Sequence, residues 1–266
     1  MLSDTHTHTY YSADSKTDPE ENIKKAVENG QKYIVLTDHF DHGLKCGKSD
    51  YNFDSLDRAD EIQRLKDIYA SKITVLCGIE TGQQPDEAVR KANDDKLAEY
   101  GFDYIIGSTH LIHGLDPYEG VYFEGKTMKE AYTELLRELI YNALLYDNYD
   151  SVGHFDYTSR YAPYENRTLR YRDFPDLLDA FFKIIISKGK ALEFNTKTAT
   201  RVEPDPDVWK RYRELGGELV TVGSDAHKPE LVGLEFRRFG SFLKSCGFDY
   251  AFIYRGRKPF AEKTDQ

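Results

Sequence analysis

Residues 18–39, DPEENIKKAVENGQKYIVLTDH, contain a helix start, a helix end and a buried strand in direct succession. Asp18 can cap a helix that Pro19 begins, and Gly30 suits the left-handed position at which helices end. The apolar run at residues 33–37 is typical of a strand that is buried on both faces of a sheet. A helix followed by such a strand is the repeating unit of a parallel α/β fold.

The same alternation continues outward from this stretch along the chain. Strands are expected at residues 2–6, 33–37, 73–79, 102–107, 151–153, 191–194, 218–222 and 250–254, and helices at 53–71, 85–100, 127–146, 174–188 and 206–215 besides the first and a last one. About eight strands in this order predict either a doubly wound open sheet or a closed (βα) barrel. No Gly-x-Gly-x-x-Gly follows the first strand, which removes the main support for a dinucleotide-binding sheet. No linker-like segment divides the chain, so we expect one domain over residues 1–266.

The composition excludes several classes of protein. The chain has 266 residues, with 36 Lys and Arg against 46 Asp and Glu, and its net charge of −10 disfavours nucleic-acid binding. No apolar run reaches the roughly 18 residues of a membrane span, and the first residues do not resemble a signal peptide. Three isolated cysteines predict neither a disulfide framework nor a thiolate metal site. We expect a cytoplasmic protein that does not bind membranes; no feature of the sequence specifies an oligomeric state.

Histidine and carboxylate side chains follow the expected strands directly or within a few residues. In a parallel barrel the C-terminal ends of the strands form one rim, so these side chains should converge there. His6 and His8 are two residues apart and face the same side of an extended chain, as do Asp225 and His227. The residues placed in this way are His6, His8, Asp38, His39, Glu80, His110, His154, Glu193, Asn195, Asp225 and His227.

This set of residue types predicts a cluster of metal ions. A single histidine is more often a packed or solvated side chain, so the prediction rests on the convergence of the whole set. Nitrogen and oxygen ligands without sulfur suit Zn, Fe or Mn, and the set is too large for one ion, so two or three divalent transition metals are expected. Glu80 would be costly to bury unpaired, and a cation would neutralise it. Metal clusters with a bridging carboxylate are the usual machinery for hydrolysing phosphate esters.

Six ordered motifs resemble those of the polymerase and histidinol phosphatase (PHP) superfamily over nearly the whole chain. They are Asp4-Thr5-His6-Thr7-His8, Thr37-Asp38-His39, Gly78-Ile79-Glu80, Gly107-Ser108-Thr109-His110, Gly153-His154-Phe155-Asp156 and Gly223-Ser224-Asp225-Ala226-His227. The resemblance implies an α/β fold, a distorted TIM-like (βα) barrel of about seven parallel strands. Chain length and the segments at residues 193–196 and 223–229 are similar to the histidinol-phosphate phosphatases within this superfamily.

The resemblance also implies a trinuclear metal site. The first metal would be bound by His6, His8, Glu80 and Asp225. Glu80 would bridge to a second metal, which His110 and His154 also hold. The third would use His39, His227 and Asp14, a position at which some members of the superfamily have histidine.

The implied reaction is the hydrolysis of L-histidinol phosphate, a small phosphomonoester of histidine biosynthesis, by a metal-bridged hydroxide. Glu80 and Asp225 would be catalytic through the metals, and His42 is a candidate general acid. Arg160 is the first candidate for a phosphate clamp. Arg201 and Lys197 are the second and third candidates, since residues 197–201 depart from the family pattern and the basic residue of that pattern has no single counterpart there. The ammonium and imidazole of the substrate need acidic or aromatic partners, for which the loops offer Asp116, Tyr118 and Glu119.

Three alternatives remain open at this point. The nearest is a PHP phosphoesterase that acts on a nucleotide, a sugar phosphate or a phosphotyrosine peptide. A metal-dependent amidohydrolase also begins with His-x-His, but it usually places a modified lysine on the fourth strand, where this chain has His110. A binding domain without activity would be expected to have lost ligands, and here every motif is filled.

Overall fold

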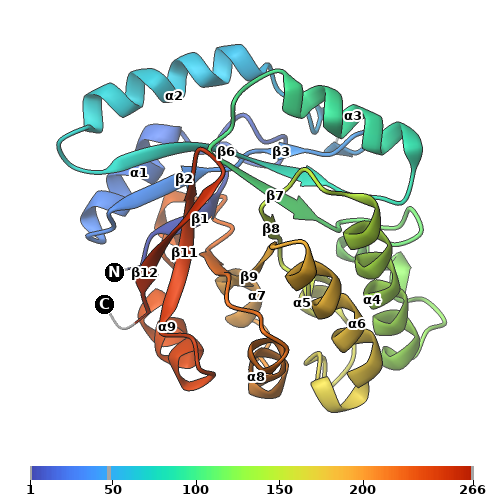
Figure 1. The fold of residues 1–266 in the computed structure, drawn as a ribbon. Helices are drawn as coiled ribbons and strands as arrows, with labels where there is room; N and C mark the ends of the chain where they lie inside the picture. Colours follow the sequence, from blue (N-terminus) through green and yellow to red (C-terminus); the bar gives the residue numbers. More distant parts are fainter. Residues whose placement is uncertain (1, 47–48, 265–266) are drawn as a thin grey trace.

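Seven parallel strands form a nearly closed barrel in the computed structural model, which describes residues 2–46 and 49–264 (Figure 1). In spatial order the strands are β1 (Asp4–Thr7), β2 (Tyr33–Leu36), β6 (Thr74–Gly82), β7 (Tyr104–Ser108), β8 (Ser151–Val152), β9 (Ala191–Asn195) and β10 (Val220–Gly223). The short strand β3 (His39–Phe40) continues β2 along the second half of β6, with His39 opposite Glu80. Of the two folds that the sequence pattern allows, the structure therefore shows the barrel and not the open sheet.

The seam between the last and the first barrel strand is held by two backbone hydrogen bonds. The Asp225 amide donates to the His6 carbonyl at 2.7 Å, and the His8 amide donates to the Ala226 carbonyl at 2.8 Å. These bonds lie just beyond the end of β10, so they bring the motif around Asp225 against the motif around His6. Closure of the barrel thus joins two segments that are more than 200 residues apart in the sequence.

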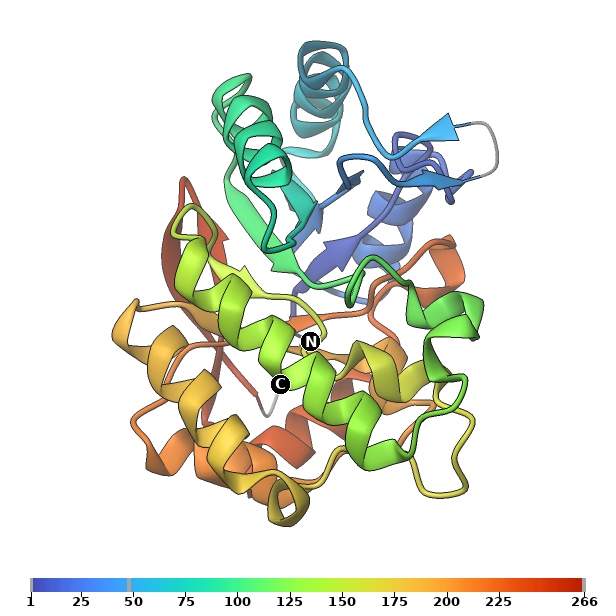
Figure 2. The same cartoon turned by 90° about the vertical axis from the view of Figure 1, so that its right-hand side faces the viewer.

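Helices surround the barrel, and most of them begin where the sequence predicts. They are α1 (Pro19–Glu28), α2 (Ser55–Tyr69), α3 (Glu87–Ala98), α4 (Met128–Leu145), α6 (Pro175–Ser187), α8 (Pro206–Glu214) and α9 (Phe236–Ser245). The carboxylate of Asp18 caps α1 as expected. The Asp18–Glu21 spacing also suits a capping box, but Glu21 pairs with Lys24 instead. A capping box is present at α4, between Thr127 and Glu130. Figure 2 shows α4 and α6 lying side by side on the outside of the strands.

Shorter elements lie in the connections between these helices and strands. They are β4 (Lys45–Cys46), β5 (Ser49–Asp50), α5 (Tyr157–Tyr161), α7 (Thr196–Ala199) and the 3-10 turns η1 (Pro117–Glu119), η2 (Val121–Phe123), η3 (Tyr171–Asp173) and η4 (Pro229–Leu231). The sequence pattern does not predict them, because each is too short to show a hydrophobic period. Two of them matter for the site, since α5 and α7 follow β8 and β9 at the rim of the barrel.

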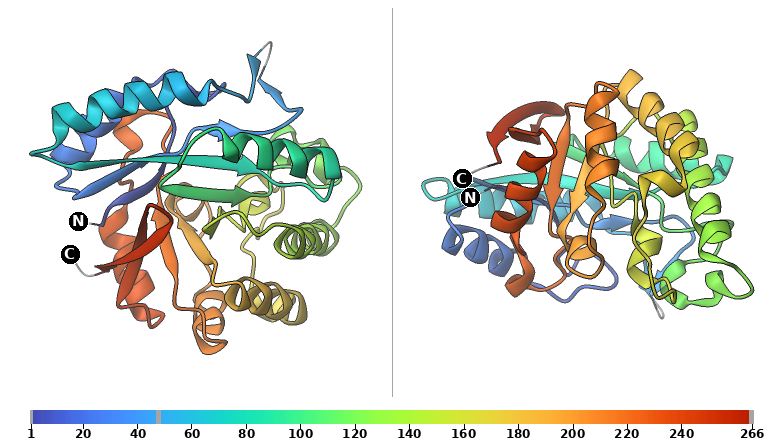
Figure 3. Two further views of the ribbon diagram at one scale, coloured as in Figure 1. Left: turned by 45° about the horizontal axis from the view of Figure 1, so that its top comes forward. Right: turned by 90° about the horizontal axis from the view of Figure 1, so that it is seen from below.

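The strand expected at residues 250–254 is present but is not the eighth strand of the barrel. It forms β11 (Tyr250–Arg255), which pairs antiparallel with β12 (Lys258–Lys263) in a separate hairpin. The ring of Tyr254 stacks on Tyr104 of β7, with ring centroids 5.3 Å apart, so the hairpin packs against the barrel instead of entering its sheet. Figure 3 shows the blue start and the red end of the chain close together, and the Ser3 amide donates to Glu262 Oε2 at 2.9 Å.

The part of the chain that the structure describes contains no helix long and apolar enough to cross a membrane.

Candidate active site

Glu80 is the centre of the polar cluster at the C-terminal rim of the barrel. Its Oε2 lies 2.9 Å from His39 Nδ1, 3.1 Å from His6 Nε2 and 3.5 Å from His8 Nε2. Its Oε1 lies 2.8 Å from His154 Nε2 and 3.2 Å from His110 Nε2. Five histidines from β1, β3 and the ends of β7 and β8 thus converge on one carboxylate, as the motif spacing predicts.

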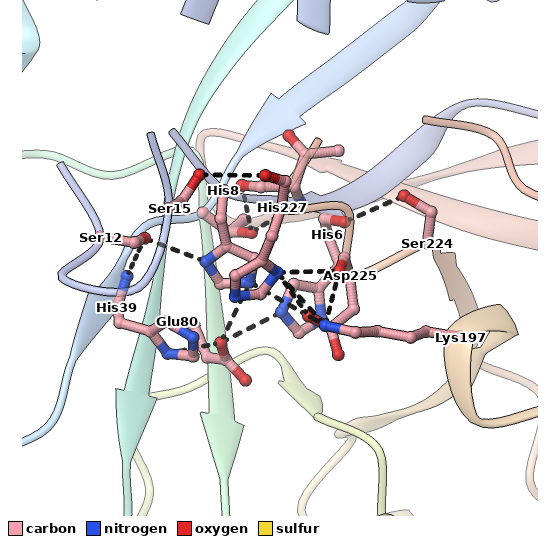
Figure 4. Close-up of polar contacts among 12 residues, drawn as sticks. His6, His8, Ser12, Ser15, His39, Glu80, Lys197, Ser224, Asp225 and His227 are labelled. Carbon is pink, nitrogen blue, oxygen red and sulfur yellow. Dashed lines mark hydrogen bonds and ion pairs between the residues drawn. The ribbon is translucent and has the colours of Figure 1, made fainter. Parts of the chain in front are cut away.

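Asp225 and His227 lie beside His8 in this cluster (Figure 4), and the more exposed Asp14 extends it toward solvent. Asp225 Oδ1 lies 3.5 Å from His8 Nε2, and the left-handed backbone of Asp225, with φ of 52°, turns the chain sharply after β10. His227 Nε2 lies 3.0 Å from Asp14 Oδ2. The structure therefore brings all nine residues predicted as metal ligands into one contiguous cluster.

Burial and the crowding of charges shift the ionisation of these groups in the metal-free chain. Burial alone would raise the pKa of Glu80, but the surrounding imidazoles of His6, His39 and His110 hold this pKa well below its usual range. Burial would lower the pKa of His110, but Asp41 and Glu80 raise this pKa to about 10. Burial lowers the pKa of His8 well below its usual value, and the neighbouring His227 and His39 act in the same direction.

The donor atoms fit divalent cations. His6 Nε2, His8 Nε2, His39 Nδ1 and Glu80 Oε2 are buried and make no hydrogen bond to any residue that the structure describes. Such atoms are costly to bury unless a ligand satisfies them. Nε2 of His110 and Nε2 of His154 face each other at 3.3 Å, an arrangement that a shared cation stabilises. Groups of three donors within 4.8 Å of one another are His6–His8–Asp225, His6–Glu80–His154, His8–His39–His227 and His39–Asp41–His110.

Two buried carboxylates of the cluster, Asp41 and Glu193, were not predicted as metal ligands or catalytic residues. Asp41 Oδ1 accepts from His110 Nδ1 at 2.6 Å, and its Oδ2 lies 3.4 Å from His39 Nδ1. Asp41 is two residues after His39, so the spacing that pairs His6 with His8 also places Asp41 beside His39. A Cβ at Gly82 would overlap the Asp41 carboxylate, so glycine is needed there.

Glu193 supports the cluster from the end of β9. Its Oε1 accepts from His6 Nδ1 at 2.6 Å, and its Oε2 accepts from the His154 amide at 2.7 Å. A carboxylate on Nδ1 fixes the ring and leaves Nε2 for a metal. The sequence places Glu193 at a strand end, but it does not show that the side chain reaches His6.

A cavity of about 270 Å³ opens above the cluster. His39, Asp41, His110, His154, Asp225 and His227 line it on the side of the barrel, whereas the fully buried Glu80, His6 and His8 lie beneath. Its outer wall is formed by Asp116, Tyr118 and Glu119 of the loop after β7 and by Tyr157 and Tyr161 of α5. This volume suits a small molecule.

Two basic side chains line the cavity beside Asp225. Arg160 Nη1 donates to Asp225 Oδ2 at 2.8 Å, Nη2 donates to Asn195 Oδ1 at 3.0 Å, and Nε donates to Thr198 Oγ1 at 3.0 Å. Lys197 Nζ lies 3.1 Å from Asp225 Oδ1. Most of the Arg160 fork is thus already engaged by Thr198, Asp225 and Asn195, and its role as a phosphate clamp stays a prediction.

Two predicted residues are not brought to the cavity. The side chain of His42 is exposed and does not line it, and the same holds for Arg201. Both were selected because they follow a site residue closely in the sequence, but the turn at His42 and the end of α7 direct them elsewhere.

The barrel and the histidine–carboxylate rim together define the class of metal-dependent barrel hydrolases. Comparison with known proteins refines this class. A family model described as PHP domain matches residues 4–197. The chain is 32% identical to a probable histidinol-phosphatase of Clostridium acetobutylicum over 98% of this chain and 100% of the relative.

It is also 28% identical to the histidinol-phosphatase of Lactococcus lactis, over 96% of this chain and 95% of the relative. The crystal structure of histidinol phosphate phosphatase from Lactococcus lactis, in complex with zinc, L-histidinol and phosphate, superimposes with a TM-score of 0.89 at 27% identity. It is matched over 98% of this chain and 100% of that one. The chain belongs to the PHP family and, within it, to the histidinol-phosphatases.

Proposed function

We propose that the protein is a metal-dependent phosphomonoesterase that hydrolyses L-histidinol phosphate to L-histidinol and inorganic phosphate. The observation that carries this proposal is the division of the cavity into two ends. The buried cation ligands and Arg160, with the half-buried Lys197, form its deeper end, and Asp116, Tyr118 and Glu119, which are half-buried or exposed, form its outer end. A phosphate ester with a cationic, imidazole-bearing head group matches both ends.

The deeper end would bind the phosphoryl group. The clustered histidines and carboxylates would hold divalent cations, which would supply a hydroxide nucleophile at neutral pH and neutralise charge on the phosphoryl oxygens. Arg160 and Lys197 add fixed positive charge at the edge of the cluster, where charge develops as the ester bond breaks. Because Asp225 contacts both basic groups and lies beside His8, it couples the phosphate-binding side chains to the ligand cluster.

The outer end would bind the leaving group. Burial raises the pKa of Asp116, whose Oδ1 accepts from the Tyr118 amide at 2.8 Å and from the Tyr157 hydroxyl at 3.1 Å. A bound ammonium or imidazolium would favour the charged form of this carboxylate. A nucleotide brings a larger group without such a cation, so this wall favours a cationic amino alcohol.

We further propose three cations. His6, His8, Glu80 and Asp225 would hold the first, Glu80, His110 and His154 the second, and His39, His227 and Asp14 the third. Anomalous scattering from crystals grown with Mn²⁺ should show three peaks, and Asp14→Ala should remove chiefly the third. A single peak, or equal loss of all peaks in Asp14→Ala, would refute this assignment.

A phosphate-release screen tests the activity. Protein stripped by chelation should release no phosphate, and reloading with Mn²⁺ or Zn²⁺ should restore release. The substrates compared would be histidinol phosphate, nucleotides, a sugar phosphate and a phosphotyrosine peptide. Metal-dependent release that is fastest from histidinol phosphate supports the proposal, whereas preference for another substrate would retain the phosphoesterase and replace its substrate.

A further inference from the structure

The loop between β1 and α1 holds a hydroxyl that contacts two of the clustered histidines at once. Ser12 Oγ lies 3.1 Å from His8 Nδ1 and accepts a hydrogen bond from the His39 amide, also at 3.1 Å (Figure 4). The same oxygen lies 2.9 Å from Asp38 Oδ1. Ser12 is 1% exposed, and among the described residues these three groups are the hydrogen-bond partners of its hydroxyl.

The direction of each hydrogen bond follows from the protons available. A serine hydroxyl has one proton to donate and two lone pairs that accept. The His39 amide can only donate, and an ionised carboxylate can only accept. The hydroxyl proton therefore goes to Asp38, and the remaining lone pair of Ser12 is left for His8 Nδ1–H.

Asp38 is itself fixed by buried donors. Its Oδ1 accepts from the Thr9 amide at 2.6 Å, and its Oδ2 accepts from Arg58 Nε at 2.7 Å. Arg58 is only 1% exposed and also donates to the Leu36 carbonyl at 2.7 Å. An arginine so deeply buried is tolerated because it is paired, and here its partner is the carboxylate that orders Ser12.

The other ordered rings of the cluster use a simpler arrangement. His6 and His110 each direct Nδ1 to a carboxylate oxygen at 2.6 Å, from Glu193 and Asp41 respectively. His8 has no carboxylate on Nδ1 and reaches one only through Ser12. The ring nevertheless directs Nε2 to the same region, between Glu80 and Asp225.

We propose that Ser12 and Asp38 are positioning residues, which hold the His8 ring with its proton on Nδ1 so that the Nε2 lone pair faces the cation site. Arg58 anchors this chain of hydrogen bonds from α2. The proposal rests on the proposed function in so far as Nε2 is directed at a cation. It assigns a role to a serine and an aspartate that do not themselves contact the cavity.

Ser12→Ala tests this role with the least damage to the fold. Asp38→Asn would leave Arg58 buried without a charged partner and could prevent folding. Ser15→Ala is the matched control, because Ser15 is a buried serine of the same loop whose hydroxyl contacts the His227 carbonyl at 3.3 Å, and Thr17 Oγ1 also donates to that carbonyl, at 2.7 Å. The first measurement is calorimetric titration of the chelator-stripped full chain with Mn²⁺ alone.

Ser12→Ala should weaken Mn²⁺ binding about 10- to 100-fold, as is usual when a second partner of a metal-binding histidine is lost, and Ser15→Ala should weaken it less than about threefold. Melting temperatures of the two stripped variants should be similar. Equal affinities for Mn²⁺ in the two variants would overturn the proposal.

The second measurement reads the ring directly, without metal or substrate. Nitrogen-15 spectra of histidine-labelled, stripped protein should show His8 protonated on Nδ1, and this preference should be lost in Ser12→Ala. His8 protonated on Nε2 in the unsubstituted chain would overturn the proposal. This readout is independent of the proposed function, because it gives the same answer whether or not the chain binds Mn²⁺ or releases phosphate.

Discussion

Glu80 combines complete burial with contacts to five histidines of the cluster. Five imidazole nitrogens lie between 2.8 and 3.5 Å from its two oxygens. A lone carboxylate in such a place would be neutralised by a proton, but here the histidines hold its pKa well below the usual range against the effect of burial. The residue therefore remains charged in the metal-free chain, as the proposed bridge between two cations requires.

Glu80→Gln should lower kcat by at least about 100-fold, more than is typical for loss of an outer partner of a metal ligand. The amide keeps the shape of the side chain but removes the charge that neutralises the cations. Metal content and kcat would be measured on the same preparation, with Glu87→Gln on the exposed face of α3 as the control. Full activity of Glu80→Gln at full metal content would exclude a bridging role.

Arg160→Ala should raise KM about tenfold or more and weaken inhibition by free phosphate, because a charge-assisted hydrogen bond is commonly worth 1.5–3 kcal/mol. It should also reduce metal content, since Asp225 loses its partner at 2.8 Å. Arg160→Lys should keep the positive charge but lose the contacts to Asn195 and Thr198. Arg201→Ala is the comparison, as Arg201 is exposed outside the cavity; a larger effect there would transfer the phosphate role to Arg201.

The sequence predicts the convergence of the histidines and carboxylates well and the surrounding side chains less well. His6 with His8 and Asp225 with His227 are recognisable because a spacing of two residues shares one face of an extended chain. Asp41 has the same spacing from His39, but β3 is only two residues long and gives no strand signal. His42 and Arg201 were assigned by closeness in the sequence, which does not fix the direction of a side chain in a turn.

The hairpin of β11 and β12 shows how an element can be predicted correctly and placed wrongly. Residues 250–254 have the apolar pattern of a strand, and they form one. The pattern does not specify its partner, and β12 is largely exposed and contains Pro259, so it was not expected at all. At the hairpin tip Arg257 Nε lies 2.6 Å from Asp150 Oδ2. This ion pair attaches the hairpin to the residue that precedes β8, at the end of the barrel opposite the site.

Tyr254→Ala tests the contribution of this hairpin. Tyr254 is 3% exposed and stacks on Tyr104, so the truncation should cost about 3–5 kcal/mol of unfolding free energy, as is typical for a large buried aromatic. Tyr250→Ala is the control, since Tyr250 is 47% exposed and should change stability little. The kcat of the folded fraction should be unchanged in both; a loss of kcat in Tyr254→Ala would show that the hairpin also shapes the site.

Most of the remaining architecture follows from the sequence because most helices carry their own start signal and the barrel strands are largely buried on both faces. Aspartates cap α1, α2, α3 and α8, and the capping box of α4 lies at Thr127. Alternation alone does not distinguish an open sheet from a barrel. Closure depends on the contacts between β10 and β1, which no local pattern contains.

The stability of the whole molecule should depend on pH in opposite ways with and without metal. The metal-free chain gains stability from His6, His39 and His110, whose pKa values are raised by nearby carboxylates against the effect of burial. A raised histidine pKa stabilises the folded chain fully when the pH is below 6.5, the pKa in the unfolded chain. For His110 this contribution is lost as the pH rises toward about 10, the pKa in the folded chain. The lowered pKa of Glu80 has the opposite effect. It stabilises the folded chain when the pH is above 4.5, and this contribution is lost as the pH falls.

Cations take the place of these protons, so metal binding should become more favourable as the pH rises. The difference in melting temperature between Mn²⁺-loaded and stripped protein should therefore widen between about pH 6 and about pH 9. Asp41→Asn removes a carboxylate that raises the pKa of His110, so the widening should be smaller in that variant. A difference that does not change with pH would contradict this linkage of metal binding to the histidines.

Selectivity for the substrate belongs to the whole cavity, because the cluster alone requires only a phosphate ester. The net charge of −10 favours the approach of a cationic head group only weakly, so discrimination must come from the wall around Asp116 and Glu119. The most direct test is the ratio of kcat/KM for histidinol phosphate and p-nitrophenyl phosphate, measured with the same Mn²⁺-loaded protein. A ratio of at least about 100, equivalent to roughly 2.7 kcal/mol of differential transition-state binding, is the predicted result. Equal efficiencies for the two esters, or a higher efficiency with a nucleotide or a phosphotyrosine peptide, would contradict it.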